Sequence, residues 1–168
     1  MKKKLGFALV LSTLLMTGCV GLTPIVDWNP VHIFIEAVDA EGNSILSPDM
    51  PDMTLTFKGE TYSVTDGYYP VQPPTRAYLP RMYGLVAQPM YEIDGKTVYR
   101  LAFGEIDGAA DMDEDILLHW PDGTEDVIHY RCSNHRSWPE VKCKRTWKLN
   151  GEVHEGETFR FAGKSLPQ

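Results

Sequence analysis

The 168-residue chain has no apolar run long enough to cross a membrane as a helix. Spanning the hydrocarbon core takes about 20 consecutive apolar residues, and the strongest candidate, residues 5–15, is far shorter. The remainder also lacks an amphipathic helical pattern of about ten residues or more. These absences argue against both a membrane-spanning protein and a helical one.

The signatures of the common enzyme classes are missing as well. There is no Gly-x-Ser-x-Gly elbow, no His-Glu-x-x-His pair, no phosphate-binding loop and no dinucleotide-binding fingerprint. Five histidines are present, and Ser133 and Ser137 lie near His135, but no motif joins them. We therefore predict no catalytic residue and no cofactor, with a hydrolase as the less favoured alternative.

Positive charge is scarce. Lys and Arg together number 16 against 23 Asp and Glu, and three of the lysines lie in the first four residues. Removing residues 1–18 leaves about ten net negative charges on the rest of the chain. A nucleic-acid partner is excluded on this ground, because phosphate binding depends on clustered Lys and Arg.

The amino terminus has the order of a secretory signal. A basic start at residues 2–4 precedes the apolar residues 5–15 and the boundary Leu15-Met16-Thr17-Gly18-Cys19. This boundary resembles the lipobox of bacterial lipoproteins, which implies cleavage before Cys19 and lipid attachment to it. Several acyl chains on one residue make a lasting membrane anchor. The predicted organisation is a signal peptide (1–18), a lipidated tether (19–30) and one β domain (31–168).

Cysteine is also rare, with three residues in the chain. If Cys19 carries lipid, Cys132 and Cys143 remain as a pair in an exported, oxidising setting, and we predict a disulfide between them. The alternative is a metal site that adds His135 to the two thiols, but the spacing matches no known zinc pattern.

What the sequence does contain is short alternating strands separated by turn signals. Val31, Ile33 and Ile35 alternate with more polar residues, and turns are expected at Gly59-Glu60, Asp94-Gly95, Pro121-Asp122-Gly123 and Asn150-Gly151. The expected strands cover residues 31–37, 53–58, 61–65, 83–88, 91–93, 96–103, 115–120, 126–132, 143–149 and 158–161. Residues 66–80 and 133–142 are expected to be loops. This pattern predicts an all-β fold, an antiparallel β-sandwich of Ig-like or related type, with a small β-barrel as the alternative.

Two groups of residues are candidate binding sites. Aromatic side chains on expected loops can stack on sugars or anchor a protein partner, and the candidates are Tyr68, Tyr69, Tyr78 and Trp138. An acidic run is a weak candidate for calcium, although it departs from the EF-hand pattern; its members are Asp107, Asp111, Asp113 and Asp115. We predict no metal, and treat the acidic run as a solvated loop.

The lipobox, the entry at residues 27–31 and the strand phrases at 56–62 and 119–123 together resemble small uncharacterised lipoproteins of gut Bacteroidota. The resemblance implies an outer-membrane lipoprotein with a β-rich envelope domain and no assigned activity, so no site residue is transferred. Its expected partners are the membrane, through the lipid on Cys19, and an envelope protein or a glycan. Residues 20–24 lack an acidic stretch, which favours the periplasmic face over the cell surface.

Overall fold

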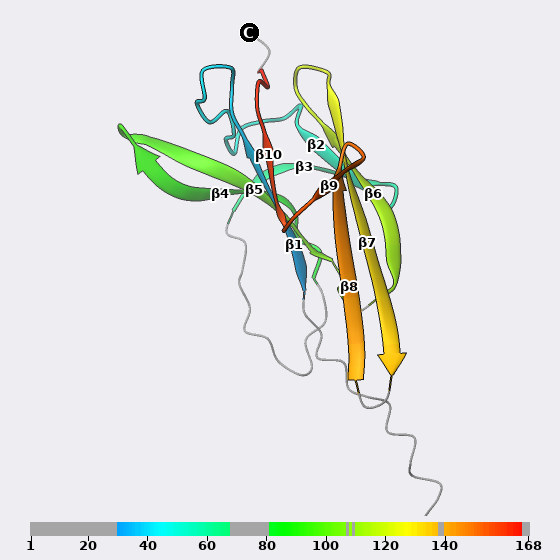
Figure 1. Cartoon of the computed structure of the whole chain (residues 1–168). Helices are drawn as coiled ribbons and strands as arrows, with labels where there is room; N and C mark the ends of the chain where they lie inside the picture. The colour runs from blue at the N-terminus through cyan, green and yellow to red at the C-terminus, as the bar shows by residue number, and fades with distance from the viewer. Residues whose placement is uncertain (1–29, 68–80, 107, 109, 138–139, 166–168) are drawn as a thin grey trace, which may run out of the picture.

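The all-β prediction is confirmed by a computed structural model that describes residues 30–67, 81–106, 108, 110–137 and 140–165. Ten strands form one sheet (Figure 1). They are β1 (Val31–Ala37), β2 (Thr54–Phe57), β3 (Glu60–Asp66), β4 (Gly84–Ile93), β5 (Lys96–Ile106), β6 (Met112–His119), β7 (Glu125–Ser137), β8 (Glu140–Leu149), β9 (Glu152–His154) and β10 (Thr158–Phe161). Within the described ranges no helix is long and apolar enough to cross a membrane.

The sheet is mixed and open, with the order β10-β1-β5-β4-β3-β2-β6-β7-β8-β9. Of the nine neighbouring pairs among these described strands, seven are antiparallel, but β3 pairs with β4 in parallel, and β1 pairs with β10 in parallel. The purely antiparallel arrangement expected from the turn pattern is therefore wrong at these two places. Parallel pairs join segments far apart in the chain, so turn residues carry no signal for them.

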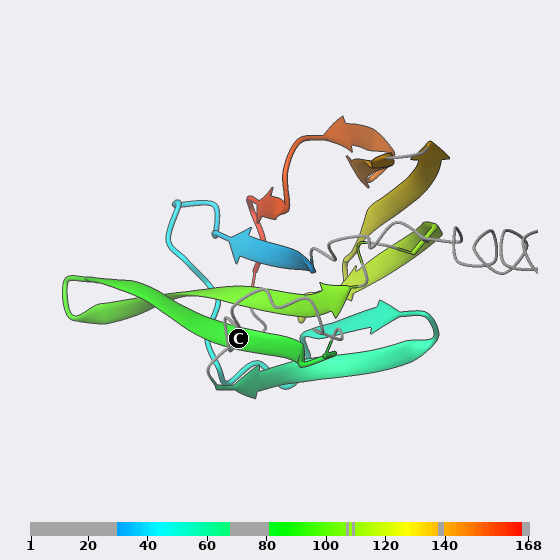
Figure 2. The ribbon, with the colours of Figure 1, turned by 90° about the horizontal axis from the view of Figure 1, so that it is seen from below.

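The sheet curls around a single interior (Figure 2). Its edge strands, β9 and β10, are separated by only residues 155–157. Such a link spans at most about 14 Å even when extended, whereas the two edges of a flat ten-stranded sheet lie about 43 Å apart. The short link therefore requires the two edges to approach one another.

The inner face carries the core. In β1 the residues Val31, Ile33, Ile35 and Ala37 are buried while the alternate residues are half-buried, as the period of two predicts. Aromatic rings join strands across the interior: Phe57 of β2 meets Phe103 of β5 edge-on at 5.8 Å between centroids, and Trp147 of β8 meets Phe159 of β10 at 5.6 Å. Trp120 and Trp147 are both buried.

Three hairpins use two-residue turns at 58–59, 94–95 and 150–151. Both residues of each turn have a positive φ, between 50° and 89°, which is the geometry that matches strand twist. The turns at 94–95 and 150–151 lie where predicted. The first hairpin turns at Lys58-Gly59, one residue earlier than predicted, because Phe57 pairs with Glu60.

The loop predicted at 133–142 is wrong. β7 continues to Ser137 and β8 begins at Glu140, so the two strands remain paired along a ribbon beyond the end of β6. The last rung that β7 shares with β6 is Met112 opposite Cys132. Residues 133–135 and 142–143 of this ribbon are exposed or half-buried, so its sequence does not need the apolar alternation by which strands are recognised.

A buried carboxylate ties the carboxyl-terminal segment to the β6–β7 hairpin. Asp126 accepts hydrogen bonds from Trp120 Nε1 at 2.7 Å and Asn150 Nδ2 at 2.7 Å, and it contacts Lys164 Nζ at 2.6 Å. Burial raises the pKa of the Asp126 carboxyl, but the hydrogen bonds from Lys164, Asn150 and Trp120 outweigh it and hold the pKa below its usual range.

Replacing this carboxylate should destabilise the fold. We expect Asp126→Asn to lower the free energy of unfolding by roughly 2–4 kcal/mol, because Lys164 loses its buried counter-charge. The pKa of Asp126 is lower in the folded protein than in the unfolded chain. Its carboxylate therefore stabilises the fold fully above the unfolded-state pKa of about 3.9, and this stabilisation is lost as the pH falls through the pKa of the folded state. Urea unfolding of the parent protein and of Asp126→Asn at pH 7 and at pH 3 measures the loss of stability and its pH dependence. The difference in unfolding free energy between the two proteins should be smaller at pH 3.

The exposed Asp52 provides the matched control. Asp52→Asn should change the free energy of unfolding by less than about 0.5 kcal/mol. A loss for Asp126→Asn no larger than this would show that the carboxylate does not hold the two segments together.

Candidate functional site

The β4–β5 hairpin extends beyond the strands that flank it. β3 pairs with β4 only at Leu85–Ala87, and β1 pairs with β5 only at residues 101–106. Residues 88–100 therefore form a two-stranded ribbon, and no third strand of the described residues pairs with either side of it. Figure 1 shows this green ribbon projecting sideways from the curled sheet.

On the β5 edge of the ribbon, some backbone groups have no ladder partner among the residues that the structure describes. Lys96 pairs with Ile93 across the two-residue turn, so Lys96 and then alternate residues of β5 direct their N–H and C=O groups towards β4. Thr97 and Tyr99 direct theirs to the opposite side. On that side β1 pairs with β5 from Leu101 onward and not before. An edge of this kind can accept a further strand.

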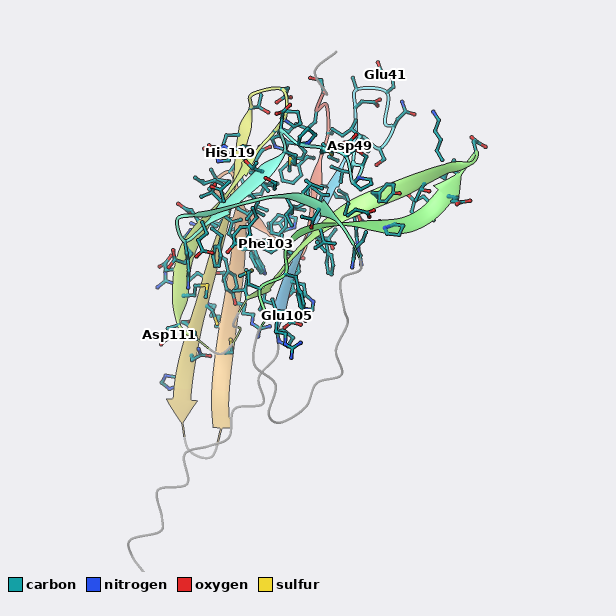
Figure 3. All side chains as sticks on the ribbon, turned by 180° about the vertical axis from the view of Figure 1, so that it is seen from behind. Glu41, Asp49, Phe103, Glu105, Asp111 and His119 are labelled. Atoms are coloured by element: carbon teal, nitrogen blue, oxygen red, sulfur yellow. The ribbon has the colours of Figure 1, made fainter. Side chains whose placement is uncertain are left out.

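This free edge borders a cleft of about 880 Å³. Its other wall is the end of β1 and the segment that folds back after it, where Val38 bridges to Ser44 and Ile45 N donates to Ala37 O at 3.2 Å. Figure 3 shows Glu41 at the tip of this segment, at the same end of the molecule as the ribbon. The cleft is thus a wedge that opens where β1 and β5 separate.

The folded-back wall is held by one carboxylate. Asp39 accepts hydrogen bonds from Asn43 N at 2.7 Å, from Asn43 Nδ2 at 3.0 Å and from Glu41 N at 3.0 Å. The bonds from Asn43 contribute most to holding the pKa of Asp39 below its usual range. The wall is therefore formed in advance of any ligand.

Large apolar side chains lie on the ribbon itself. Met90 is 41% exposed, and Tyr91 and Ile93 are each 53% exposed, and all three line the cleft with Tyr99. Charged groups stand on the other wall, where Arg160 Nε donates to Glu36 Oε2 at 2.8 Å. An exposed apolar group of this kind beside unpaired backbone favours a binding surface.

A second, smaller cleft of about 370 Å³ lies near Phe57 and Met112. Its two carboxylates are already engaged: Glu60 accepts from Tyr62 Oη at 2.6 Å, and Glu105 accepts from Arg81 N at 3.2 Å. The bond to Glu60 raises the pKa of Tyr62 to about 12. Neither of these two clefts is lined by a histidine.

The acidic run does not converge. Asp113 and Asp115 lie on the exposed face of β6, where His129 contacts both, through Nε2 at 3.2 Å and Nδ1 at 2.8 Å. Asp111 accepts from Asn134 N at 2.6 Å. Among the described residues no group of three or more His, Cys, Asp or Glu side chains could hold a metal ion.

Several candidates lie outside the described residues. They are the lipid-attachment residue Cys19, the loop aromatics Tyr68, Tyr69, Tyr78 and Trp138, and Asp107 of the acidic run. Their predicted roles remain predictions.

Cys132 and Cys143 share one face of the β7–β8 ribbon, with their sulfur atoms 3.0 Å apart and not bonded. Cys132 is buried, while Cys143 is exposed. The thiols approach diagonally, because Cys132 lies opposite Arg145 and Cys143 opposite Asn134. The disulfide stays a prediction.

No protein-family model, no curated protein and no solved structure matches this chain. The interpretation of the clefts therefore depends on their own geometry.

Sequence reasoning missed the β4–β5 edge, although one signal for it was present. Pro89 lies inside an otherwise regular strand pattern, and proline is confined to edges and bulges because it cannot donate to a ladder. The structure places a register shift between Pro89 and Tyr91. Nothing local to Thr97 or Tyr99 shows that β1 separates from β5 beside them.

Hydrogen exchange tests the free edge directly. We expect peptides covering 88–100 to exchange at least tenfold faster than peptides covering 101–106, since residues 101–103 are paired with both β1 and β4. Mass spectrometry of the native protein over a time series gives both rates. Equal protection of the two segments would mean that the β5 edge is covered.

Proposed function

We propose that the chain is a lipid-anchored envelope protein whose β domain is a non-enzymatic binding module for an extended segment of a partner protein. The segment adds as a strand to the β5 edge and fills the adjoining cleft. The observation that carries this proposal is the combination of unpaired backbone at Thr97 and Tyr99 with a preformed cleft beside it.

Backbone pairing and side-chain contacts have separate parts in this mode of binding. Hydrogen bonds to an exposed edge supply affinity for any extended segment, while neighbouring pockets choose its side chains. Here Met90, Tyr91 and Ile93 offer apolar contact, and Glu36 and Arg160 offer charge on the facing wall. The expected segment is extended, with apolar side chains on one face.

A glycan-binding accessory lipoprotein is the second candidate. Its support is that Tyr91 and Tyr99 line the same cleft as Asp39, Asn43 and Asp94. Exposed tyrosine rings stack on sugars, while carboxylates and amides bind hydroxyl groups. This candidate depends on the rings and not on the β5 backbone.

We also propose that the curled sheet is sandwich-like, Ig-like or related, rather than a small barrel. The support is twofold: aromatic pairs such as Phe57 with Phe103 join facing strands, and β9 is not paired with β10 as a closed barrel would require.

The binding proposal is tested by photo-crosslinking in the cells that produce the protein. A photoreactive residue at Met90, in the cleft, should give a discrete adduct, whereas the same residue at Val153 on the β9 edge should not. Thr97→Pro should reduce the Met90 adduct at least tenfold, because it removes an N–H from the free edge without removing a ladder bond to β4.

Thr97→Val is the matched control, since it keeps the N–H and changes only the side chain. It should leave the adduct intact. If Thr97→Pro and Thr97→Val both crosslink normally while Tyr91→Ala abolishes the adduct, the strand-addition proposal is wrong. The cleft then binds a glycan, or a partner protein through side chains alone. Melting temperatures of the variants should agree within a few degrees.

The anchor is tested at Cys19. Cys19→Ser should move the protein from the membrane fraction to the soluble fraction, because the acyl chains supply the binding free energy. Membrane fractions washed with high salt and with carbonate measure how much of the protein remains bound.

Protease treatment of intact and of permeabilised cells then distinguishes the cell surface from the proposed periplasmic face of the outer membrane. Retention in washed membranes of a Cys19→Ser protein whose residues 1–18 have been removed would contradict lipid anchoring.

A further inference from the structure

We propose that Cys132 and Cys143 form a thiol–disulfide exchange site, in which Cys143 attacks an exposed disulfide of another molecule and Cys132 then completes the exchange. The co-reactant is a protein or small-molecule disulfide, such as an exported thiol oxidoreductase would present. The site lies on the β7–β8 ribbon and is independent of the cleft beside β5.

The two thiols differ in access. Cys132 is 2% exposed and Cys143 is exposed, although their sulfur atoms are 3.0 Å apart. An incoming disulfide can therefore reach Cys143 first, while Cys132 is already placed to attack Cys143 in the second step. Burial raises the pKa of the Cys132 thiol, which also makes Cys132 the slower nucleophile towards a disulfide in solution.

One cation lies beside the exposed thiol. Arg145 is on the same ribbon face, and its guanidinium interacts with Cys143. Both thiols also donate to the buried carbonyl of Gly108, at 3.5 Å from Cys132 and 3.4 Å from Cys143. Arg145 Nη2 reaches the same oxygen at 3.3 Å.

The exchange balances as two displacements. The Cys143 thiolate attacks one sulfur of the incoming disulfide, forming a mixed disulfide and releasing one thiolate, which takes up a proton. The Cys132 thiol loses its proton, attacks the Cys143 sulfur and releases the second thiol. The protein dithiol becomes a disulfide, and the incoming disulfide is reduced to a dithiol.

The register makes the closed form reversible. Diagonal positions in an antiparallel ladder have Cα atoms about 7–8 Å apart, whereas disulfides usually join Cα atoms about 4.4–6.8 Å apart. Bond formation therefore requires β7 and β8 to shift locally, and a strained, accessible disulfide is the kind most readily reduced. Closure also removes both thiol donors from Gly108 O, so it loosens the β5–β6 connection.

The experiment uses the full chain with Cys19→Ala, so that only two thiols remain, and oxidised glutathione as the probe. Intact-mass spectrometry should show the parent closing an internal disulfide, Cys132→Ala accumulating a mixed disulfide at Cys143, and Cys143→Ala reacting at least tenfold more slowly. Reduced glutathione in excess should reopen the internal disulfide.

Three results would overturn the proposal: equal reaction of the two single variants, two mixed disulfides on the parent without closure, or an internal disulfide that excess reduced glutathione does not open. The last result would make the bond a structural one. Melting curves show that each variant is folded.

Comparing Arg145→Gln with Arg145→Lys tests the role of the positive charge of Arg145. The glutamine variant should slow the first step several-fold and the lysine variant should largely restore it. Failure of this test leaves the cleft beside β5 unaffected.

Discussion

The whole architecture depends on the three-residue link between the two edges of the sheet. β9 and β10 stand at opposite ends of a ten-stranded order, yet residues 155–157 join them. His154 stacks on Phe159 at 4.3 Å between ring centroids, and its Nε2 lies 2.9 Å from Thr158 O. This contact holds the edges together by side chains, without a ladder. Once the edges meet, every strand must present one face to a common interior.

The curl explains where surplus strand length goes. A curled sheet of short strands buries only the middle of its longer strands. The strands β5 and β7, with 11 and 13 residues, therefore extend beyond the strand that flanks them on one side. Both extensions remain paired with their hairpin partners and project as ribbons (Figure 1). The two candidate sites lie where a flanking strand stops: the β5 edge opens just before the Leu101 rung with β1, and Cys132 occupies the last rung of β7 with β6.

The sequence predicted what local patterns control. Alternation identified β1 with its exact bounds, and the turns at 94–95 and 150–151 were found because Asp-Gly and Asn-Gly accept positive φ. The parallel pairs and the strand order could not be predicted, since they depend on contacts between distant segments. The ribbon beyond Cys132 was expected to be a loop because a strand without a buried face does not need an apolar alternation. The site residues Thr97 and Tyr99 were missed for a related reason: their importance comes from the absence of β1 beside them.

The direction of β1 relates the proposed anchor to the two sites. The tether enters the fold at Val31, and the cleft beside β5 opens after Ala37, at the other end of the same strand. Seven residues of strand separate these ends by roughly 20 Å. In Figure 1 the β7–β8 ribbon extends towards the Val31 end, whereas the β4–β5 ribbon lies towards the Ala37 end. The strand β1 therefore separates Val31, where the proposed tether would join the domain, from the proposed binding cleft. The β7–β8 ribbon extends away from the cleft, so the proposed partner in the cleft and the proposed disulfide exchange at Cys143 would not obstruct each other.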